Sequence, residues 1–369
     1  MSTSLELICN QFNFHGNFKN INPYGDGHIN DTYKVTYLNA DGHVTHYILQ
    51  RVNHLIFKNT EGLMENIQNV TSYLSDMITE EENLDGFDVL ELVKTRSKTS
   101  FYKDPEGNYW RAYIFVEGAT GHTFAEDTSM LYEAGKAFGQ FQRLLQDYPV
   151  LSLHETIKDF HHTQRRYETF MTTYQENPCN RAETCMDQIH FIQARKSLTS
   201  IIIEALDSKA IPYRVTHNDT KINNVLLDDT TGVGRCVIDL DTVMPGSALY
   251  DFGDAIRSCG SNLEEDSEDL DQLVLDLERF EAYTKGFLEV MGHSLTPKEL
   301  ELLPSAAIVM TLECGIRFLT DHIDGDHYFK VHRPNHNLSR AKNQFRFVEV
   351  MEENMATMKA IVNKYATVN

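Results

Sequence analysis

One stretch, residues 214–254, constrains the fold of this chain more than any other. It opens with the tripeptide His-Asn-Asp at 217–219, and Asn224 follows shortly after. Two short apolar runs come next, separated by a turn rich in Asp, Thr and Gly, and the second run leads directly into Asp239. Apolar runs around a polar turn predict a β-hairpin. Such a hairpin would bring Asn224, before one strand, close to Asp239, after the other.

This arrangement suits phosphoryl transfer. That reaction needs a carboxylate that orients and deprotonates the attacking hydroxyl, and oxygen ligands for a Mg²⁺ ion that bridges the phosphates. Asp219 is the candidate base, and Asn224 and Asp239 are candidate metal ligands because hard cations prefer carboxylate and amide oxygens. The alternative is a polar surface hairpin in which Asp and Asn serve turns and caps. The spacing of His217, Asp219, Asn224 and Asp239 beside two apolar strands favours the catalytic interpretation.

The stretch differs from that of protein kinases, because Asn218 replaces their Arg and Asp251-Phe252-Gly253 comes too late for the metal position. It resembles instead the aminoglycoside phosphotransferase family of small-molecule kinases, whose motifs read roughly H-G-D-x-x-x-x-N and I-D. Within that family, HNDTKINNVLLD and VIDLDTVMPG are most similar to N-acetylhexosamine 1-kinases. The resemblance implies an α+β, two-lobed, protein-kinase-like fold that binds ATP and Mg²⁺ between its lobes.

A glycine-containing loop precedes the first clear strand pair. The pattern G-x-G-x-x-N allows backbone N–H groups to approach phosphates closely, although a plain hairpin with a glycine turn fits the same residues. Its position ahead of two β-runs, well before the catalytic stretch, favours the phosphate-binding interpretation. We expect nucleotide contacts from Gly25, Gly27, His28, Ile29 and Asn30, and His28 is also a candidate sugar contact.

No lysine occupies the phosphate-facing point of the following strand, where Gln50 and Arg51 stand instead. Only one of them can face the phosphates, because strand side chains alternate between faces. Arg51 is favoured because a guanidinium suits phosphate oxygens; an ordinary surface Arg is the alternative. The helical pattern over 60–77 offers Glu61 and Glu65 as partners, and the sequence leaves the choice between them open.

Residues 1–117 are predicted to form the N-terminal nucleotide-binding lobe, an antiparallel sheet with one helix. A strand is expected over 89–93, and the resemblance implies that Phe115 to Glu117 form the hinge that binds adenine. Residues 118–369, where the hydrophobic period changes to that of helices, are predicted to form a larger, mainly helical catalytic and sugar-binding lobe. Within it, Gly135 and Gly139 would allow a helix to pack closely against a neighbour.

Two polar groups in this lobe have different expected roles. Asp251, in the family's Y-D motif, is expected to orient the catalytic loop through hydrogen bonds. His161 and His162 lie near Arg165 and Arg166, which could suggest a metal or phosphate site. A solvated helix face is the favoured interpretation of that cluster.

The apolar helical pattern over 306–319 contains Arg317, an unusual residue for a buried helix. The resemblance to N-acetylhexosamine 1-kinases implies that Arg317 and Tyr328 line the sugar pocket, and Asp321 is a further candidate there. The alternative is that Arg317 pairs with Glu313, one turn earlier. No spacing among the His and Asp residues of 321–336 matches a zinc site.

Composition sets outer limits on function. The net charge of −21, from 33 basic and 54 acidic residues, argues against a nucleic-acid partner. The N-terminus lacks the pattern of a signal peptide, no apolar run of membrane-spanning length is evident, and the six cysteines form no C-x-x-C pair. These features predict a cytoplasmic protein with no membrane partner.

Together these observations predict an ATP-dependent kinase that phosphorylates the anomeric hydroxyl of an N-acetylhexosamine. The same chemistry on homoserine, choline or an aminoglycoside is the nearest alternative. A nucleotide-binding pseudokinase is a further one, supported by the missing strand lysine and opposed by Asp219, Asn224 and Asp239. The sequence leaves open the choice between GlcNAc and GalNAc, and the oligomeric state.

Overall fold

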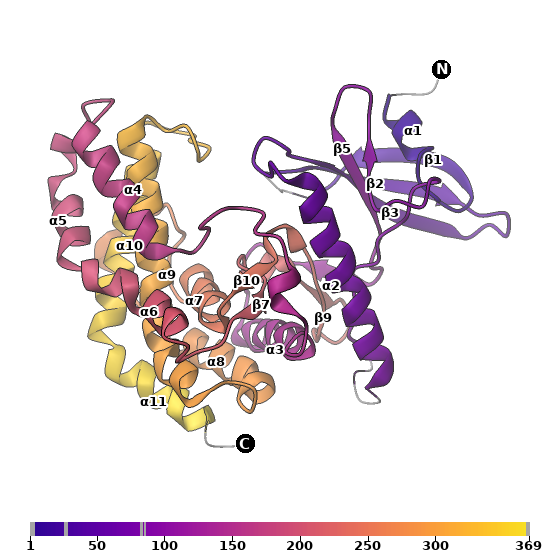
Figure 1. Cartoon of the computed structure of the whole chain (residues 1–369). Helices are drawn as coiled ribbons and strands as arrows, with labels where there is room; N and C mark the ends of the chain where they lie inside the picture. The colour runs from indigo at the N-terminus through magenta and orange to yellow at the C-terminus, as the bar shows by residue number, and fades with distance from the viewer. Residues whose placement is uncertain (1–3, 26–28, 82–83, 85, 367–369) are drawn as a thin grey trace.

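The computed structural model describes residues 4–25, 29–81, 84 and 86–366. The chain forms two lobes, a sheet lobe at the N-terminus and a larger helical lobe (Figure 1). The first lobe is built on an antiparallel sheet with strand order β1-β2-β3-β5-β4. Its strands are β1 (Asn17–Pro23), β2 (Asp31–Leu38), β3 (Val44–Val52), β4 (Tyr102–Lys103) and β5 (Tyr109–Ile114). The predicted two-lobed α+β fold is confirmed.

The two faces of this sheet differ in chemistry because successive side chains alternate. One face carries Tyr47, Leu49 and Trp110, which pack with Phe12 and helix α1 (Ser4–Cys9) into a separate apolar cluster. The opposite face carries polar groups, including Gln50 on β3, which lies directly across from Arg111 on β5. The polar face is therefore the one available for a site.

Helix α2 (Thr60–Glu80) lies between the sheet and the helical lobe (Figure 1). It begins after Asn59, whose side-chain oxygen accepts a hydrogen bond from the Gly62 N–H, as N-cap residues do. Of the two candidate partners on this helix, Glu61 and Glu65, the second contacts the His154 ring at 2.9 Å. The prediction of a strand over 89–93 is wrong. This segment makes isolated β-bridges, such as Leu92 to Tyr113, in place of a continuous strand.

The chain leaves the sheet lobe after β5 and enters β6 (Ala119–Gly121), which pairs with β8 (Val225–Asp228) of the helical lobe. The predicted lobe boundary at residue 117 lies in this connection. The α-helices of the second lobe are α3 (Thr128–Leu144), α4 (Thr163–Glu176), α5 (Met186–Ala194), α6 (Ile201–Asp207), α7 (Ala248–Cys259), α8 (Leu277–Met291), α9 (Pro297–Asp324), α10 (His336–Glu353) and α11 (Met355–Ala366).

Small residues allow the helices of this lobe to approach closely. A Cβ on Gly135 of α3 would lie 2.5 Å from the carbonyl oxygen of Tyr283 on α8, and one on Gly286 would lie 2.0 Å from the carbonyl oxygen of Tyr132. Both distances are shorter than real Cβ contacts, so these glycines set the separation of α3 and α8, as expected for Gly135.

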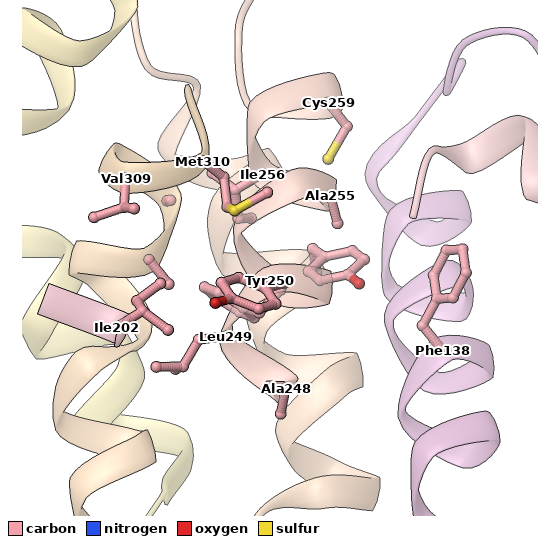
Figure 2. Packing of buried hydrophobic residues seen from close by; sticks show 14 of the residues in the cluster. Phe138, Ile202, Ala248, Leu249, Tyr250, Ala255, Ile256, Cys259, Val309 and Met310 are labelled. Atoms are coloured by element: carbon pink, nitrogen blue, oxygen red, sulfur yellow. The ribbon is translucent and has the colours of Figure 1, made fainter. Parts of the chain in front are cut away.

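Helix α7 is buried at the centre of the lobe. Figure 2 shows its side chains among those of neighbouring helices, with Val309 and Met310 of α9 on one side and Phe138 of α3 on the other. Helix α9 is long and apolar enough, by length and composition alone, to cross a membrane. Because 83% of its apolar window is buried inside the protein, it serves here as a core helix. The buried helix α7 carries Asp251 and Asp254, which accept hydrogen bonds from the loop that begins at His217.

Candidate active site

The stretch singled out above folds as expected. Strand β7 (Arg214–Thr216) leads into the loop with His217 to Asn224, and β8 then pairs antiparallel with β9 (Gly234–Val237). The backbone N–H of Ile238 donates to the Asn224 carbonyl oxygen at 2.9 Å. Asp239 is the next residue, so the hairpin brings the two candidate metal-ligand positions to one end of the strand pair.

Asn218 stands at the position where the family motif H-G-D has glycine, and the backbone conformation shows why asparagine is accepted there. Its φ is +65°, a left-handed conformation that glycine adopts freely and Asn tolerates better than most residues. The Asn218 amide also donates to the Thr242 carbonyl oxygen at 2.8 Å. Asn therefore replaces Gly at this position and adds a hydrogen bond that ties the loop to the turn after Asp239.

The backbone of the loop is held by carboxylates from α7. Asp251, fully buried, accepts hydrogen bonds from the His217 N–H at 2.9 Å and the Asn218 N–H at 2.7 Å, and from the Gln142 amide. Asp254 accepts one from the Thr220 N–H at 3.0 Å. The expected role of Asp251 in orienting the loop is confirmed.

Buried His217 joins the loop to the neighbouring strand. One ring nitrogen, Nε2, donates to the Ile238 carbonyl oxygen at 2.8 Å, and Nδ1 accepts from the Asp219 N–H at 3.3 Å. A neutral ring with its proton on Nε2 satisfies both contacts. Phe138 and Phe141 of α3 pack against the ring edge-on, which fixes its plane.

Asp219, the candidate base, has two close polar neighbours in the loop. Its carboxylate contacts the Lys221 ammonium at 2.9 Å and accepts a 3.1 Å hydrogen bond from the Asn224 amide. Burial raises the pKa of this carboxyl, but the Lys221 charge, the hydrogen bond from Lys221 and the more distant charge of Arg257 together hold the pKa below its usual value. Asp219 is therefore ionised at neutral pH and can accept a hydrogen bond from a hydroxyl.

Asp239 fits the role of a cation ligand. Withdrawal from bulk water, followed by repulsion from Asp241 and Asp219, raises its pKa to about 7. The Asn224 amide nitrogen points to Asp219, an orientation that leaves its oxygen Oδ1 to ligate. In the described part of the chain no three His, Cys, Asp or Glu side chains converge as a metal site. Two protein oxygens completed by phosphates and water are what Mg²⁺ commonly uses.

Asp241 links the two lobes. Its buried carboxylate forms an ion pair with Arg111 of β5, a residue with 1% of its side chain exposed, and accepts a 2.6 Å hydrogen bond from the Asn30 amide. Arg111 also donates from Nε to Gln50 at 2.9 Å. Arg111 therefore brings a buried cation from β5 to Asp241, beside a sheet face whose β3 carries no lysine.

Arg51 lies on the other side of the strand from Gln50. Its guanidinium pairs with Asp31, and both side chains are close to half exposed. In the predicted phosphate loop, Gly25 has a φ of +73° and Ile29 is exposed. The Asn30 amide donates to Asp241, as described above. Gly27 and His28 lie outside the described residues.

The predicted hinge lies beside an aromatic and charged cluster. The Phe115 N–H donates to the His46 carbonyl oxygen at 3.2 Å, and the Lys34 ammonium lies 3.6 Å from the Phe115 ring centroid. Tyr24, from the glycine loop, packs edge-on against the same ring. Glu117 contacts the His46 ring at 2.6 Å. Phe115 and Glu117 of the predicted hinge are thus both in contact with side chains of the sheet lobe.

Arg317 lies among aromatic rings. Its guanidinium is 5.2–5.7 Å from the ring centroids of Phe160, Tyr328 and Phe329, and it donates weakly to the Tyr328 hydroxyl at 3.4 Å. Glu313 instead contacts His161 and Thr163, at 2.7 and 2.5 Å. The Arg317 guanidinium therefore lies against the three aromatic rings, and Glu313, its alternative partner, is bound to His161 and Thr163.

Asp321 holds the loop that carries Tyr328. Its carboxylate accepts hydrogen bonds from the N–H groups of His327, Tyr328 and Phe329 at 2.7–2.9 Å, and from the Asn337 amide at 2.9 Å. With four donors in place and little exposure, this carboxylate shapes the loop.

The sequence reasoning missed three residues of this site and misjudged one. Arg111 was not selected because it belongs to no short motif. Asp241 and Lys221 were overlooked although each stands two residues after a selected aspartate, Asp239 and Asp219 respectively. A buried arginine in an otherwise apolar strand was the available signal for Arg111. The expectation that His161 lies on a solvated helix face is wrong: the residue is buried and contacts Glu313.

The fold and the loop chemistry define a kinase-like phosphotransferase. A family model described as "phosphotransferase enzyme family" (APH) matches residues 20–284. Because this match covers most of the chain, the protein belongs to that family. The matched range includes the glycine loop, the catalytic loop and the hairpin that ends at Asp239.

Several solved structures share the fold. A microcompartment-associated aminopropanol kinase aligns with a TM-score of 0.60 at 16% identity, covering 96% of this chain and 97% of that one. An aminoglycoside phosphotransferase from Alicyclobacillus acidocaldarius gives 0.61 at 12% identity, with 99% and 97% covered. An amicoumacin kinase in complex with AMP-PNP, Ca²⁺ and its substrate gives 0.59 at 15% identity, with 96% and 94% covered. These likenesses support the kinase-like fold.

Proposed function

We propose that this chain is a small-molecule kinase that transfers the γ-phosphoryl group of ATP to the anomeric hydroxyl of an N-acetylhexosamine. The observation that carries the reaction class is the ionised Asp219 beside Asn224 and Asp239. The same three side-chain types hold the nucleophile and the metal ion in other kinases. A structural relative with bound AMP-PNP and Ca²⁺ supports the use of ATP and a divalent cation.

In this proposal the sugar hydroxyl donates a hydrogen bond to the Asp219 carboxylate. As the sugar oxygen bonds to the γ-phosphorus, the bond from phosphorus to the leaving ADP oxygen breaks, and Asp219 takes the hydroxyl proton. When bound at Asn224 and Asp239, Mg²⁺ would neutralise charge on the phosphates. Phosphoryl transfer requires positioning and charge stabilisation more than a strong base, which agrees with a pKa of Asp219 below its usual value.

The sugar assignment is supported by the surroundings of Arg317. A guanidinium among three aromatic rings offers N–H donors for hydroxyl or acetamide oxygens and ring faces for the apolar side of a sugar. Tyr328 adds a hydroxyl and is 58% exposed. A cationic acceptor such as choline would face the repulsion of Arg317, which argues against it.

A different hydroxyl acceptor is the second candidate. The aminopropanol and amicoumacin kinases with the same fold act on amino alcohol and antibiotic substrates by name. The pseudokinase alternative loses much of its support, because Arg111 places a buried cation near Asp241 despite the missing β3 lysine.

The test is ADP release with ATP and Mg²⁺ across GlcNAc, GalNAc, glucose, galactose, choline, homoserine and kanamycin. Turnover on the N-acetylhexosamines, with phosphate on C1 by NMR, is the expected result. Turnover on choline, homoserine or kanamycin alone would refute the sugar assignment and retain the reaction class. The Asp219→Asn variant should lose turnover and keep ATP affinity, and retained turnover would refute Asp219 as the base.

A further inference from the structure

His161 makes a contact that no motif predicted. It lies just before α4, with 6% of its side chain exposed. Its Nε2 is 3.1 Å from the carbonyl oxygen of Asn218, and its Nδ1 is 2.7 Å from Oε1 of Glu313 on α9. The histidine therefore connects the middle of α9 to the peptide that joins Asn218 to Asp219.

Both ring nitrogens of His161 face acceptors, in contrast to those of His217. A carbonyl oxygen and a carboxylate can only accept hydrogen bonds, so the ring satisfies both contacts when each nitrogen carries a proton. Glu313 supplies the matching negative charge. Burial raises the pKa of Glu313, but His161, Arg317 and the bond from Thr163 outweigh it and lower the pKa below its usual value.

Asn218 is held through its backbone N–H, its side-chain amide nitrogen and its carbonyl oxygen. Its N–H donates to Asp251, its side-chain amide donates to the Thr242 carbonyl oxygen, and its own carbonyl oxygen faces His161. Its left-handed φ of +65° is a conformation that persists outside glycine when the surroundings enforce it. Removing the donor on the carbonyl side would free the peptide immediately before the base.

We propose that His161, held by Glu313, is a positioning residue for phosphoryl transfer, which fixes the Asn218 carbonyl and thereby the backbone that carries Asp219. The role rests on the proposed function of this loop as the phosphotransfer site. Glu313 stands one helical turn before Arg317 on α9, so the same helix presents the proposed sugar ligand and anchors the base. The alignment of acceptor and base therefore depends on one rigid element.

The test compares three variants. His161→Phe keeps a ring of similar size and removes both donors. The double variant H161F/E313M also removes the carboxylate that would be left buried and unpaired, a replacement that is often neutral for stability. His162→Phe is the matched control, because His162 neighbours His161 and, among the described residues, the hydrogen bond of its ring is a long one of 3.4 Å accepted from the Arg165 N–H at the start of α4.

We expect kcat of the double variant to fall by about 100-fold, the order of loss that a misplacement near 1 Å causes, while KM for ATP changes less than about twofold. Amide hydrogen exchange of residues 216–224 should be faster in H161F/E313M and unchanged in H162F. A merely structural role would lower the melting temperature and leave kcat of the folded protein unchanged.

A folded double variant with kcat within about threefold of the wild type, or with unchanged loop exchange, would overturn the proposal. If the wild-type protein phosphorylates no acceptor in the panel, the proposed function fails separately. The exchange measurement needs no acceptor, so it still decides whether His161 holds the loop.

Discussion

Replacement of Arg111 tests whether the buried ion pair with Asp241 joins the lobes. Arg111→Met removes the cation and keeps most of the side-chain volume, so the Asp241 carboxylate is left buried with the hydrogen bond from the Asn30 amide. Breaking a buried ion pair by removing one partner costs about 3–5 kcal/mol. The remaining Asn30 hydrogen bond favours the lower end of that range.

The expected change is large enough to measure by thermal unfolding. With an unfolding entropy of about 2.1 cal/mol/K per residue, a loss of about 3 kcal/mol lowers the melting temperature of a 369-residue chain by roughly 4 °C. Arg51→Met is the matched control, because Arg51 pairs with Asp31 on the surface and both are close to half exposed. Exposed pairs contribute about 0–1 kcal/mol, which corresponds to roughly 1 °C or less.

The double variant R111M/D241L completes the comparison. Replacing both charges by apolar side chains leaves no unpaired carboxylate, so most of the stability should return. Phosphoryl transfer should remain impaired, because the region near Asp239 would lack the Arg111 cation. Equal melting temperatures for R111M and R51M would refute the account of Arg111 as the interlobe cation.

Three further predictions concern the catalytic loop. Asn218→Ala should destabilise the protein by about 2 kcal/mol, from the left-handed backbone and the lost bond to Thr242, and Asn218→Gly by less; urea unfolding measures both. Asp251→Ala leaves three buried donors without their acceptor, so a loss of at least about 3 kcal/mol and a lower kcat are expected in unfolding and steady-state assays. Removing divalent cations with EDTA should abolish turnover and added Mg²⁺ restore it, with Asp239→Asn requiring more Mg²⁺; turnover that persists in EDTA would contradict the metal role.

The features that the sequence predicted are local ones. Asp219 and Asn224 share one loop, and the strand that leads to Asp239 pairs with the strand that follows Asn224. A hairpin and a loop obey short-range rules of turn chemistry and strand alternation, so spacing alone placed these residues together. The role of Asp251 was predicted on a different basis, namely its match to the family's Y-D motif.

The features that the sequence did not predict depend on contacts between distant segments. Arg111 and Asp241 are 130 residues apart, and His161 is 152 residues from Glu313. Such pairs are set by how the lobes and helices pack, which hydrophobic period does not specify. The sequence favoured Arg51 over Gln50 as the phosphate contact. Alternation places the two residues on opposite faces, and only the position of Arg111 on β5 identifies the polar face, which carries Gln50.

Charge pairing accounts for the need for a metal ion in so acidic a chain. Of the three neighbouring aspartates, Asp219 has Lys221 and Asp241 has Arg111 as direct ion-pair partners. Asp239 depends on more distant cations, and its burial, together with repulsion from Asp241 and Asp219, raises its pKa to about 7. A divalent cation at Asp239 would therefore relieve repulsion within the protein as well as between the protein and the nucleotide phosphates. Arg111 on β5 and Lys221 in the loop neutralise two of the three aspartates, and Asp239 remains for the metal ion. By this reasoning the lack of a lysine on β3 does not mark an inactive kinase.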